Sequence, residues 1–518
     1  LMFGEHTWGG SRNLEGKNAY QQKDFESFAK SDKDCQWLEN TWKDHANYID
    51  SAAHITDLLS KQTMQQLAGN ISGEGKRLVV FNPLPWKRNA LVDLPGTTGK
   101  TVVKDIPACG YKTVEIPVEN ETFESKKSES VLLENQFLKI KIDRKKGGIV
   151  SVIDKKSGRE LVDQSAPYAF GQYLYQRFDR QQMQNYHIGC SHLNTVYGSN
   201  GRCCSGWNIR ADLPDTPLYQ SAVPEFQTLS SRKTWCSQEV VLFSKASGLI
   251  QSDVKVSITL PNEFPWFEIN VQLFNKKADY WPETGSVYLP VKASDPQFRI
   301  GRLGGATNPA VEFVEGSNRT YGYVSTGAVI AGKSGEGLAI CPLDNGLMSF
   351  GEKGMGSIDP LYIPTKPLAL VSMFNNLWTI NFPYWIKGSL SSRVRIWATD
   401  QLNYSSLAIP AMEARQPVLT AITSGTKGSL PLQKEGIKIS RKGISLMVNN
   451  DNGKQIVRLW EQAGEGGELE IEFPLDQKAL RAVEVNLRDE ETGKTVEIKN
   501  HKLEIKLPAW SVVSFRLE

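Results

Sequence analysis

Histidine and cysteine are scarce in this sequence, and neither residue forms a complete metal-binding or redox motif. The 518 residues include six His and seven Cys. No C-x-x-C pair occurs, which argues against a zinc ribbon or a thioredoxin-like site. His45 and His54 do not have the spacing of a helical metal-binding pair. The H-x-x-C-x-H segment at 187–192 and the vicinal Cys203-Cys204 remain candidates, but we favour ordinary side chains and free thiols.

A charge excess and long apolar runs are also missing. Lys plus Arg total 60 against 57 Asp plus Glu, so the net charge of +3 gives no electrostatic argument for nucleic acid or a membrane surface. The apolar runs are far shorter than the ~20 residues of a membrane span. No G-x-S-x-G, P-loop or G-x-G-x-x-G motif follows a strand pattern. We therefore expect neither a nucleic-acid partner nor a membrane span, and the sequence leaves a homo-oligomer open.

The beginning of the chain is unlike a signal peptide. It reads LMFG, without a basic region or an apolar core. Because position 1 is Leu rather than Met, we interpret the sequence as the shortened form of a longer polypeptide. It consequently predicts no compartment.

The hydrophobic pattern predicts a mainly β protein with a short N-terminal helical region. Apolar residues recur every three or four positions over 34–69, which indicates a long amphipathic helix. After Gly75 the period changes to two, and strand and turn signals continue to about residue 415. A Ser/Thr/Gly/Pro-rich stretch at 416–435 precedes a further set of strands. We predict an antiparallel β-super-sandwich plus a small C-terminal β-sandwich. The predicted domains are 1–73, 74–415, with a subdivision near 120–130, and 416–518.

Three stretches combine aromatic side chains with polar groups that suit a sugar. FGEHTWGG at 3–10 places the titratable Glu5-His6 pair beside Trp8 in a glycine loop. DYWPETG covers 279–285, and FNNLWTINFPYWIKG covers 374–388. Apolar sugar faces stack on aromatic rings, while amides bind hydroxyls. A terminal loop, core packing and turn chemistry are the alternative interpretations.

Several segments together resemble family 38 glycoside hydrolases, the α-mannosidase family, in the family's order. They are FGEHTWGG, the long helix, RLVVFNPLPWKR, LENQFLKIKIDRKKGGIVSVIDKKSGREL, NNLWTINFP, and QIVRLWEQAGEG with LPAWSVVSFRL. The resemblance runs over nearly the whole sequence and is to the C-terminal portion of the family. It implies a galactose-mutarotase-like super-sandwich and an oligosaccharide or glycan substrate.

The resemblance also implies a retaining exo-α-mannosidase that binds one divalent ion, usually zinc. His6 matches the family's late metal ligand, and Thr7 stands where mannosidases of the family usually carry Asp, which leaves the sugar open. The early H-x-D motif is absent from this sequence. We therefore expect the nucleophile, the acid/base and most zinc ligands in a missing N-terminal catalytic domain, with no catalytic residue here and no activity of this chain alone. The predicted substrate-binding residues are Thr7, Trp8, Asn375, Asn376, Trp378 and Asn381.

Two other functions remain open from the sequence. One is a non-catalytic carbohydrate-binding or scaffolding module that uses the same aromatic residues without a metal. The other is a family relative that acts on a different α-linked sugar. Sugar binding that a chelator does not diminish is the observation that favours the first.

Overall fold

The chain folds into two compact units. The computed structural model describes residues 14, 17–97, 99–117, 122–124, 128–186, 189, 210, 212–302, 304–314, 317–333, 335–354, 356–359, 361–377, 382–423, 425, 428–451 and 453–518. Unit 1 comprises Leu1–His54, Thr122–Ile300 and Thr307–Leu402, and unit 2 comprises Ile55–Glu121, Gly301–Ala306 and Asn403–Glu518. Unit 2 therefore groups the strands before residue 122 with the C-terminal strands. The domain boundaries at 73/74 and 415/416 stay predictions.

The predicted long helix is α2 (Lys33–Gly69). The Asp32 carboxylate caps it by accepting hydrogen bonds from the backbone N–H groups of Asp34 and Cys35, both at 3.0 Å. The shorter helices include η2 (Ala19–Gln21), α1 (Phe25–Ser31) and α4 (Ser405–Arg415), and residues 180–186 are also helical. In the described part of the chain, no helix is long and apolar enough to cross a membrane.

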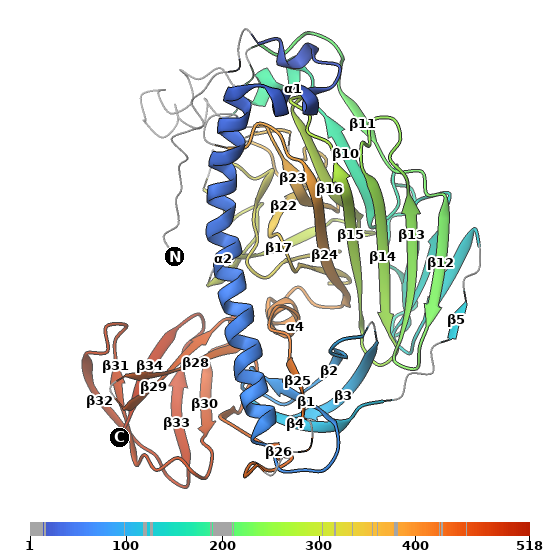
Figure 1. The fold of residues 1–518 in the computed structure, drawn as a ribbon. Coiled ribbons are helices and arrows are strands. Elements are labelled where there is room, and N and C mark those ends of the chain that lie inside the picture. Colours follow the sequence, from blue (N-terminus) through green and yellow to red (C-terminus); the bar gives the residue numbers. More distant parts are fainter. Residues whose placement is uncertain are drawn as a thin grey trace. The chain divides into compact units, whose positions relative to one another are not determined.

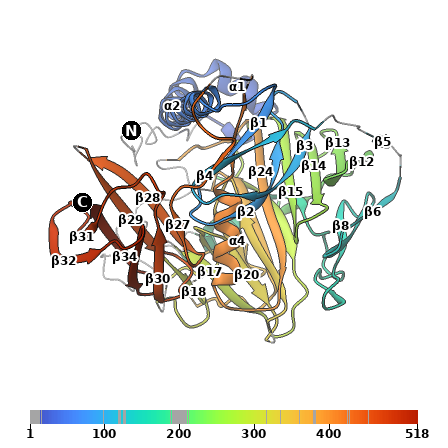
Figure 2. The same cartoon turned by 90° about the horizontal axis from the view of Figure 1, so that it is seen from below.

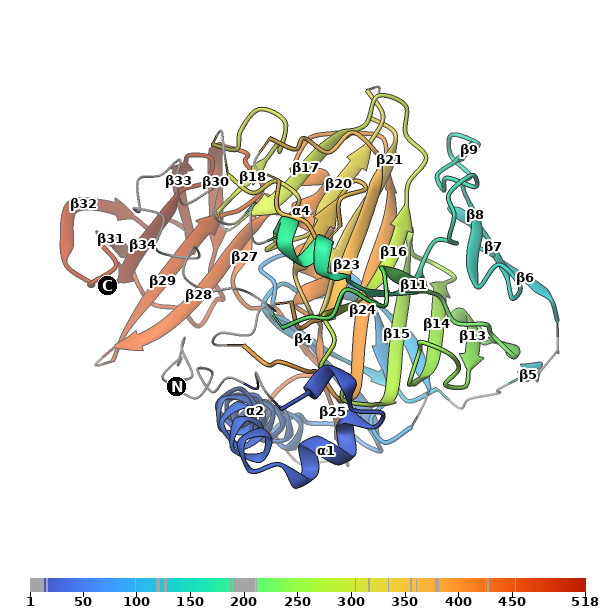
Figure 3. The same ribbon diagram turned by 90° about the horizontal axis from the view of Figure 1, so that it is seen from above.

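Most of unit 1 consists of three antiparallel sheets, and buried side chains of all three belong to one core (Figure 3). The ten-stranded sheet runs β18 (Gly305–Thr307), β17 (Gln297–Arg302), β20 (Ala328–Ala331), β21 (Gly337–Pro342), β24 (Gly388–Thr399), β15 (Trp266–Lys276), β14 (Asp253–Pro261), β13 (Ser237–Ser244), β12 (Thr228–Lys233), β5 (Thr122–Glu124). The six-stranded sheet runs β11 (Gln220–Ala222), β10 (Gln172–Arg177), β16 (Glu283–Pro290), β23 (Leu368–Asn375), β22 (Leu347–Phe350), β19 (Tyr321–Tyr323). The four-stranded sheet runs β6 (Ser130–Glu134), β7 (Leu138–Asp143), β8 (Gly148–Asp154), β9 (Arg159–Glu160).

The alternating pattern of the sequence explains how these sheets pack. In β7 the side chains of Leu138, Ile140 and Ile142 are buried, while Lys139 and Lys141 between them are exposed. Successive side chains of a strand point to opposite faces, so one face of β7 joins the core. The predicted mainly β fold with an antiparallel super-sandwich is thereby confirmed.

Unit 2 contains two small sheets and the terminal β-sandwich (Figure 2). The small sheets run β25 (Leu419–Thr423), β1 (Arg77–Asn82), β4 (Gly110–Glu115), β26 (Gln433–Lys434), and β2 (Arg88–Asp93), β3 (Lys100–Ile106). The sheets of the sandwich run β27 (Lys438–Ile439), β30 (Gly467–Glu472), β33 (Lys502–Leu507), and β28 (Ile444–Asp451), β29 (Lys454–Glu461), β34 (Val512–Leu517), β31 (Arg481–Val485), β32 (Glu491–Glu497). Buried side chains from both sheets, including Ile471 and Phe515, form their shared core.

Two asparagines in the motifs that resemble family 38 hold turns rather than ligands. The Asn82 amide, in RLVVFNPLPW, donates to the carbonyls of Trp86 (2.8 Å) and Pro107 (3.0 Å) and accepts from the N–H of Leu84 (3.1 Å). The Asn135 amide, in LENQFLKIKID, donates to the carbonyls of Pro261 at the end of β14 and Phe264 in the turn before β15, and it accepts two backbone N–H bonds. Both asparagines are buried. These motifs thus specify backbone connections in each unit.

Asn82→Ala is expected to lower the free energy of unfolding of unit 2 by about 2–4 kcal/mol, because it leaves buried backbone groups without their partners. Asn449→Ala is the matched control, since Asn449 is an exposed asparagine of the same unit, and its loss should stay below about 0.5 kcal/mol. Differential scanning calorimetry of both variants measures the difference. Equal melting temperatures for the two variants would contradict the role given to Asn82.

Candidate functional site

Two of the predicted sugar-binding stretches meet at one end of the super-sandwich. Antiparallel pairing sets Thr284 of β16 opposite Asn375 of β23. Because β16 begins where β23 ends, the loop before β16 and the loop after β23 leave the sheet at the same end of its strands. The first loop carries DYW of DYWPETG, and the second carries the residues that follow Asn375. Helix α1 lies at this end in Figure 1.

Asn376 ties the two loops together. Its side-chain oxygen accepts the backbone N–H of Glu283 at 2.6 Å, and its amide nitrogen donates to the carbonyls of Trp281 and Tyr384, each at 2.9 Å. The residue is 1% exposed. A fully buried amide with these partners positions backbone and offers nothing to a sugar in this conformation. The structure therefore gives Asn376 a positioning role in place of the predicted sugar contact.

The other predicted site residues are described only in part. Asn375 is half-buried at the last position of β23. His6, Thr7, Trp8, Trp378 and Asn381 lie outside the described residues. Their roles stay predictions.

We use the term joint for the contact between the loop at 277–282, the described residues 376–377 and 382–387 of the second loop, and the N-terminal residues 14 and 17–42. Arg210 is a central residue of the joint, and the sequence did not predict it. Its guanidinium donates to the carbonyls of Tyr280 (2.6 Å), Asn376 (2.5 Å) and Tyr384 (3.1 Å), and to the Tyr20 hydroxyl at 3.3 Å. The side chain is buried and lies 4.9 Å from the centre of the Tyr280 ring. An isolated Arg in an irregular stretch carries no periodic signal, so only the folded structure identifies it.

An aromatic cluster attaches the N-terminal segment to the same loops. The rings of Tyr20 and Tyr280 are 4.6 Å apart, those of Phe25 and Trp385 are 5.0 Å apart, and Trp42 lies 4.6 Å from Trp385. The indole N–H of Trp385 also donates to a carboxylate of α2 at 2.8 Å. Aromatic pairs in such contact contribute about 0.5–1.5 kcal/mol beyond their buried area. Leu14 and residues 17–42 are consequently fixed to this end of the sandwich.

A buried ion pair joins the two strands that flank the first loop. Lys276 at the end of β15 binds Glu283 at the start of β16 across 2.5 Å, with side chains 6% and 1% exposed. The Tyr175 hydroxyl donates to the other Glu283 oxygen at 2.7 Å. Burial raises the pKa of the Glu283 carboxyl above its usual value, and the charge of Lys276 opposes that shift. The pair holds the two ends of the loop that carries Asp279, Tyr280 and Trp281.

Burial also keeps the phenols of the joint neutral. It raises the pKa of Tyr20 to about 12 and that of Tyr384 to about 12. Both hydroxyls therefore stay protonated over the ordinary pH range and act as hydrogen-bonding groups rather than bases.

An open polar pocket of about 550 Å³ adjoins the joint. Tyr20, Gln22 and Asp24 line it from the N-terminal segment, and Arg177 and Asp279 line it from the sandwich. The Arg177 guanidinium pairs with Asp279 at 3.3 Å and lies 4.6 Å from the centre of the Trp281 ring. This arrangement suits a hydroxylated ligand.

The described residues contain no group of three or more His, Cys, Asp or Glu side chains placed to hold a metal ion. The His45 ring nitrogen Nδ1 lies 2.9 Å from the carbonyl of Thr41, a contact within its own helix. Cys35, Cys109, Cys236 and Cys341 are free thiols. The H-x-x-C-x-H segment and Cys203-Cys204 lie outside the described residues.

Comparison with known proteins supports the resemblance to glycoside hydrolases that the sequence motifs indicated. Residues 133–280 match the glycosyl hydrolases family 38 C-terminal domain. The resemblance to family 38 is confirmed. The matched segment begins in β6 and ends at Tyr280, so it includes most of the first loop of the joint.

Curated and structural relatives agree with this match. The chain is 30% identical over 130 residues to "Alpha-mannosidase 2C1" of Homo sapiens and 28% identical over 129 residues to its Mus musculus counterpart. These alignments cover 23% of this chain and 12% of each relative. The fold resembles the crystal structure of an α-mannosidase from Enterococcus faecalis V583, with a TM-score of 0.64 and 11% identity, over 92% of this chain and 60% of that chain. The matches thus span 12% of the length of the two curated relatives and 60% of the length of the bacterial structure.

Lys276→Met is expected to destabilise unit 1 by about 3–5 kcal/mol, because it leaves the Glu283 carboxylate buried without its counter-charge. The double variant Lys276→Met/Glu283→Gln should recover a substantial part of that loss, since no uncompensated charge remains. Chemical denaturation of the wild type, both single variants and the double variant gives the coupling free energy. Additive effects of the two substitutions would contradict the pair.

Proposed function

We propose that this chain is the C-terminal part of a retaining, metal-dependent exo-α-mannosidase that removes α-linked mannose from glycans. The domain match at 133–280 and the α-mannosidase relatives support a glycosidase of family 38 as the whole protein. In this proposal the nucleophile and the acid/base belong to an N-terminal catalytic domain outside this sequence, and the 518-residue chain alone is inactive.

The joint described above is the observation that carries the proposal for this chain's own role. It fixes three groups of described residues at one end of the sandwich: Leu14 with residues 17–42, the 279–285 stretch, and residues 374–377 and 382–388 of the third stretch. The second and third belong to stretches that the sequence analysis assigned to sugar binding, and the first follows FGEHTWGG in the chain. Aromatic rings and amides on loops held by a rigid sheet are typical of carbohydrate sites.

Few residues separate the predicted site residues from buried residues of the joint. Leu14 is 0% exposed in the aromatic cluster, and His6 precedes it by eight residues. Eight residues span at most about 28 Å when fully extended. Residues 378–381 follow Leu377, which is also buried at this end.

In the intact enzyme, we assign His6 as one ligand of a zinc ion whose other ligands lie in the catalytic domain. Zinc sites use about four ligands, so the imidazole of His6 alone does not hold the ion tightly. The bound ion supplies a Lewis acid at the sugar. Thr7, Trp8 and Trp378 line the sugar, Asn381 and Asn375 bind hydroxyls, and Asn376 and Arg210 position these residues.

The direct test is an assay of the parent polypeptide, extended upstream of Leu1, on a chromogenic α-mannoside with and without a zinc chelator. We expect turnover that the chelator abolishes and that His6→Ala lowers by at least about 100-fold, the scale of a lost group at a metal site. His54→Ala is the control, since His54 is exposed on α2. A folded, zinc-loaded parent without turnover would contradict a mannosidase, and turnover by residues 1–518 alone would contradict the assignment of the catalytic groups.

Trp378→Ala in the parent should lower kcat/KM about twofold to tenfold, because an aromatic ring in stacking contact contributes about 0.5–1.5 kcal/mol beyond its buried area. Trp235→Ala is the matched control, as Trp235 is 54% exposed in the β12–β13 turn. Steady-state kinetics on the same α-mannoside compare the two variants. Equal kinetics would remove Trp378 from the sugar pocket.

A further inference from the structure

The terminal β-sandwich, residues 437–518, carries a second pocket that the proposed function does not use. Its volume is about 660 Å³, within the roughly 300–1,000 Å³ range of ligand pockets. It lies in unit 2, whereas every residue of the joint lies in unit 1. A ligand bound here is therefore bound by a different unit from the one that holds the candidate sugar site.

The strand pairing explains why two amides line this pocket. Antiparallel pairing sets Asn450 of β28 directly opposite Gln455 of β29. Directly opposed residues project from the same face of a sheet. Val448 and Val457, two residues further along each strand, form the next pair on that face, and Val457 belongs to the core of the sandwich. The pocket is thus the polar end of the face that packs the core.

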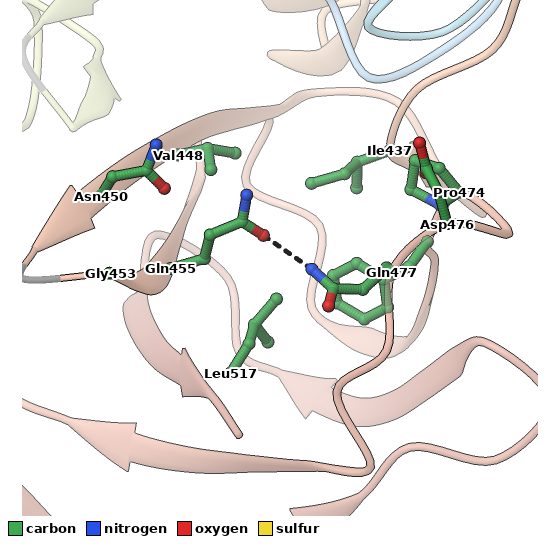
Figure 4. A pocket seen from close by; sticks show the side chains of 10 residues that line it. Ile437, Val448, Asn450, Gly453, Gln455, Pro474, Asp476, Gln477 and Leu517 are labelled. Atoms are coloured by element: carbon green, nitrogen blue, oxygen red, sulfur yellow. Dashed lines mark hydrogen bonds between the residues drawn. The ribbon is translucent and has the colours of Figure 1, made fainter.

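A hydrogen bond orients one of these amides. Gln477 donates from its amide nitrogen to the Gln455 side-chain oxygen at 2.6 Å, while its own oxygen accepts the backbone N–H groups of Lys478 (2.8 Å) and Ala479 (3.0 Å). Figure 4 shows this bond crossing the pocket, with Ile437 and Leu517 on either side of it. Gln455 therefore keeps its NH₂ group for a further acceptor.

The lining selects an uncharged ligand with both polar and apolar surface. Among the described residues, the Asn450 amide and the Gln455 NH₂ group make no other hydrogen bond. The single carboxylate of the lining, Asp476, pairs with Lys434 at 2.8 Å. Ile437 and Leu517 supply apolar surface. Amides beside aliphatic walls match the hydroxyls and the C–H faces of a sugar ring.

We propose that this pocket is a non-catalytic carbohydrate site that binds the neutral pyranose ring of a glycan through Asn450 and Gln455. Val448, Ile437 and Leu517 contact the apolar face of the ring. The site retains a glycan on the enzyme through a sugar other than the one at the candidate catalytic pocket.

Binding of methyl α-D-mannopyranoside and of a mannobiose to the 518-residue chain tests this proposal, by calorimetry and by saturation-transfer NMR, without any turnover. Asn450→Leu and Gln455→Leu should each raise the Kd about threefold to tenfold, the effect of one hydrogen bond. Asn449→Leu is the matched control, because Asn449 precedes Asn450 on β28 and projects from the opposite face. Circular dichroism verifies that each variant is folded.

Saturable sugar binding that weakens in Asn450→Leu and Gln455→Leu but not in Asn449→Leu supports the site. The absence of binding, binding that these substitutions leave unchanged, or equal binding of glycerol overturns it. Because the assay needs no catalytic domain, its failure is distinguishable from failure of the proposed mannosidase activity.

Discussion

The buried Asn376 amide is the constraint on which the functional end of unit 1 depends. Its three backbone partners are Trp281 in the loop before β16, Glu283 at the start of β16, and Tyr384 in the loop after β23. Arg210 adds bonds to the same loops and to Tyr20, so the N-terminal segment is drawn into the same network. Because buried polar groups are costly without partners, every member of this network specifies where the others lie.

This network also explains how a β-sandwich contributes to a site whose chemistry lies elsewhere. The two large sheets are rigid. Asn376 and the Lys276–Glu283 pair bind the loops to the ends of the strands and thereby restrict the motion of the loops. Pre-organised loops lose little entropy on binding a ligand. In the proposed enzyme, unit 1 presents aromatic and amide groups to the sugar, while the pocket of the terminal sandwich contacts the glycan independently.

Much of the fold could be predicted from the sequence, because it rests on local periodicity. The helix at 34–69 appears as α2, and the alternation of Leu138, Ile140 and Ile142 appears as the buried face of β7. Local periodicity does not show which distant strands pair. The sequence therefore did not predict that the strands before residue 122 group with the C-terminal strands. For the same reason Arg210 was missed, and Asn376 was assigned to a sugar although its amide binds backbone. The residue type indicates that a side chain needs hydrogen-bond partners, but only the folded structure shows which groups these partners are.

Hydrogen–deuterium exchange of the Asn376→Ala variant, followed by mass spectrometry, tests the central claim most directly. If the amide ties the two loops together and thereby holds the network that binds the N-terminal segment, exchange accelerates jointly in peptides that cover 17–31, 277–284 and 382–387. Peptides of the terminal sandwich then exchange as in the wild type. Acceleration confined to the residues next to position 376 would contradict the account.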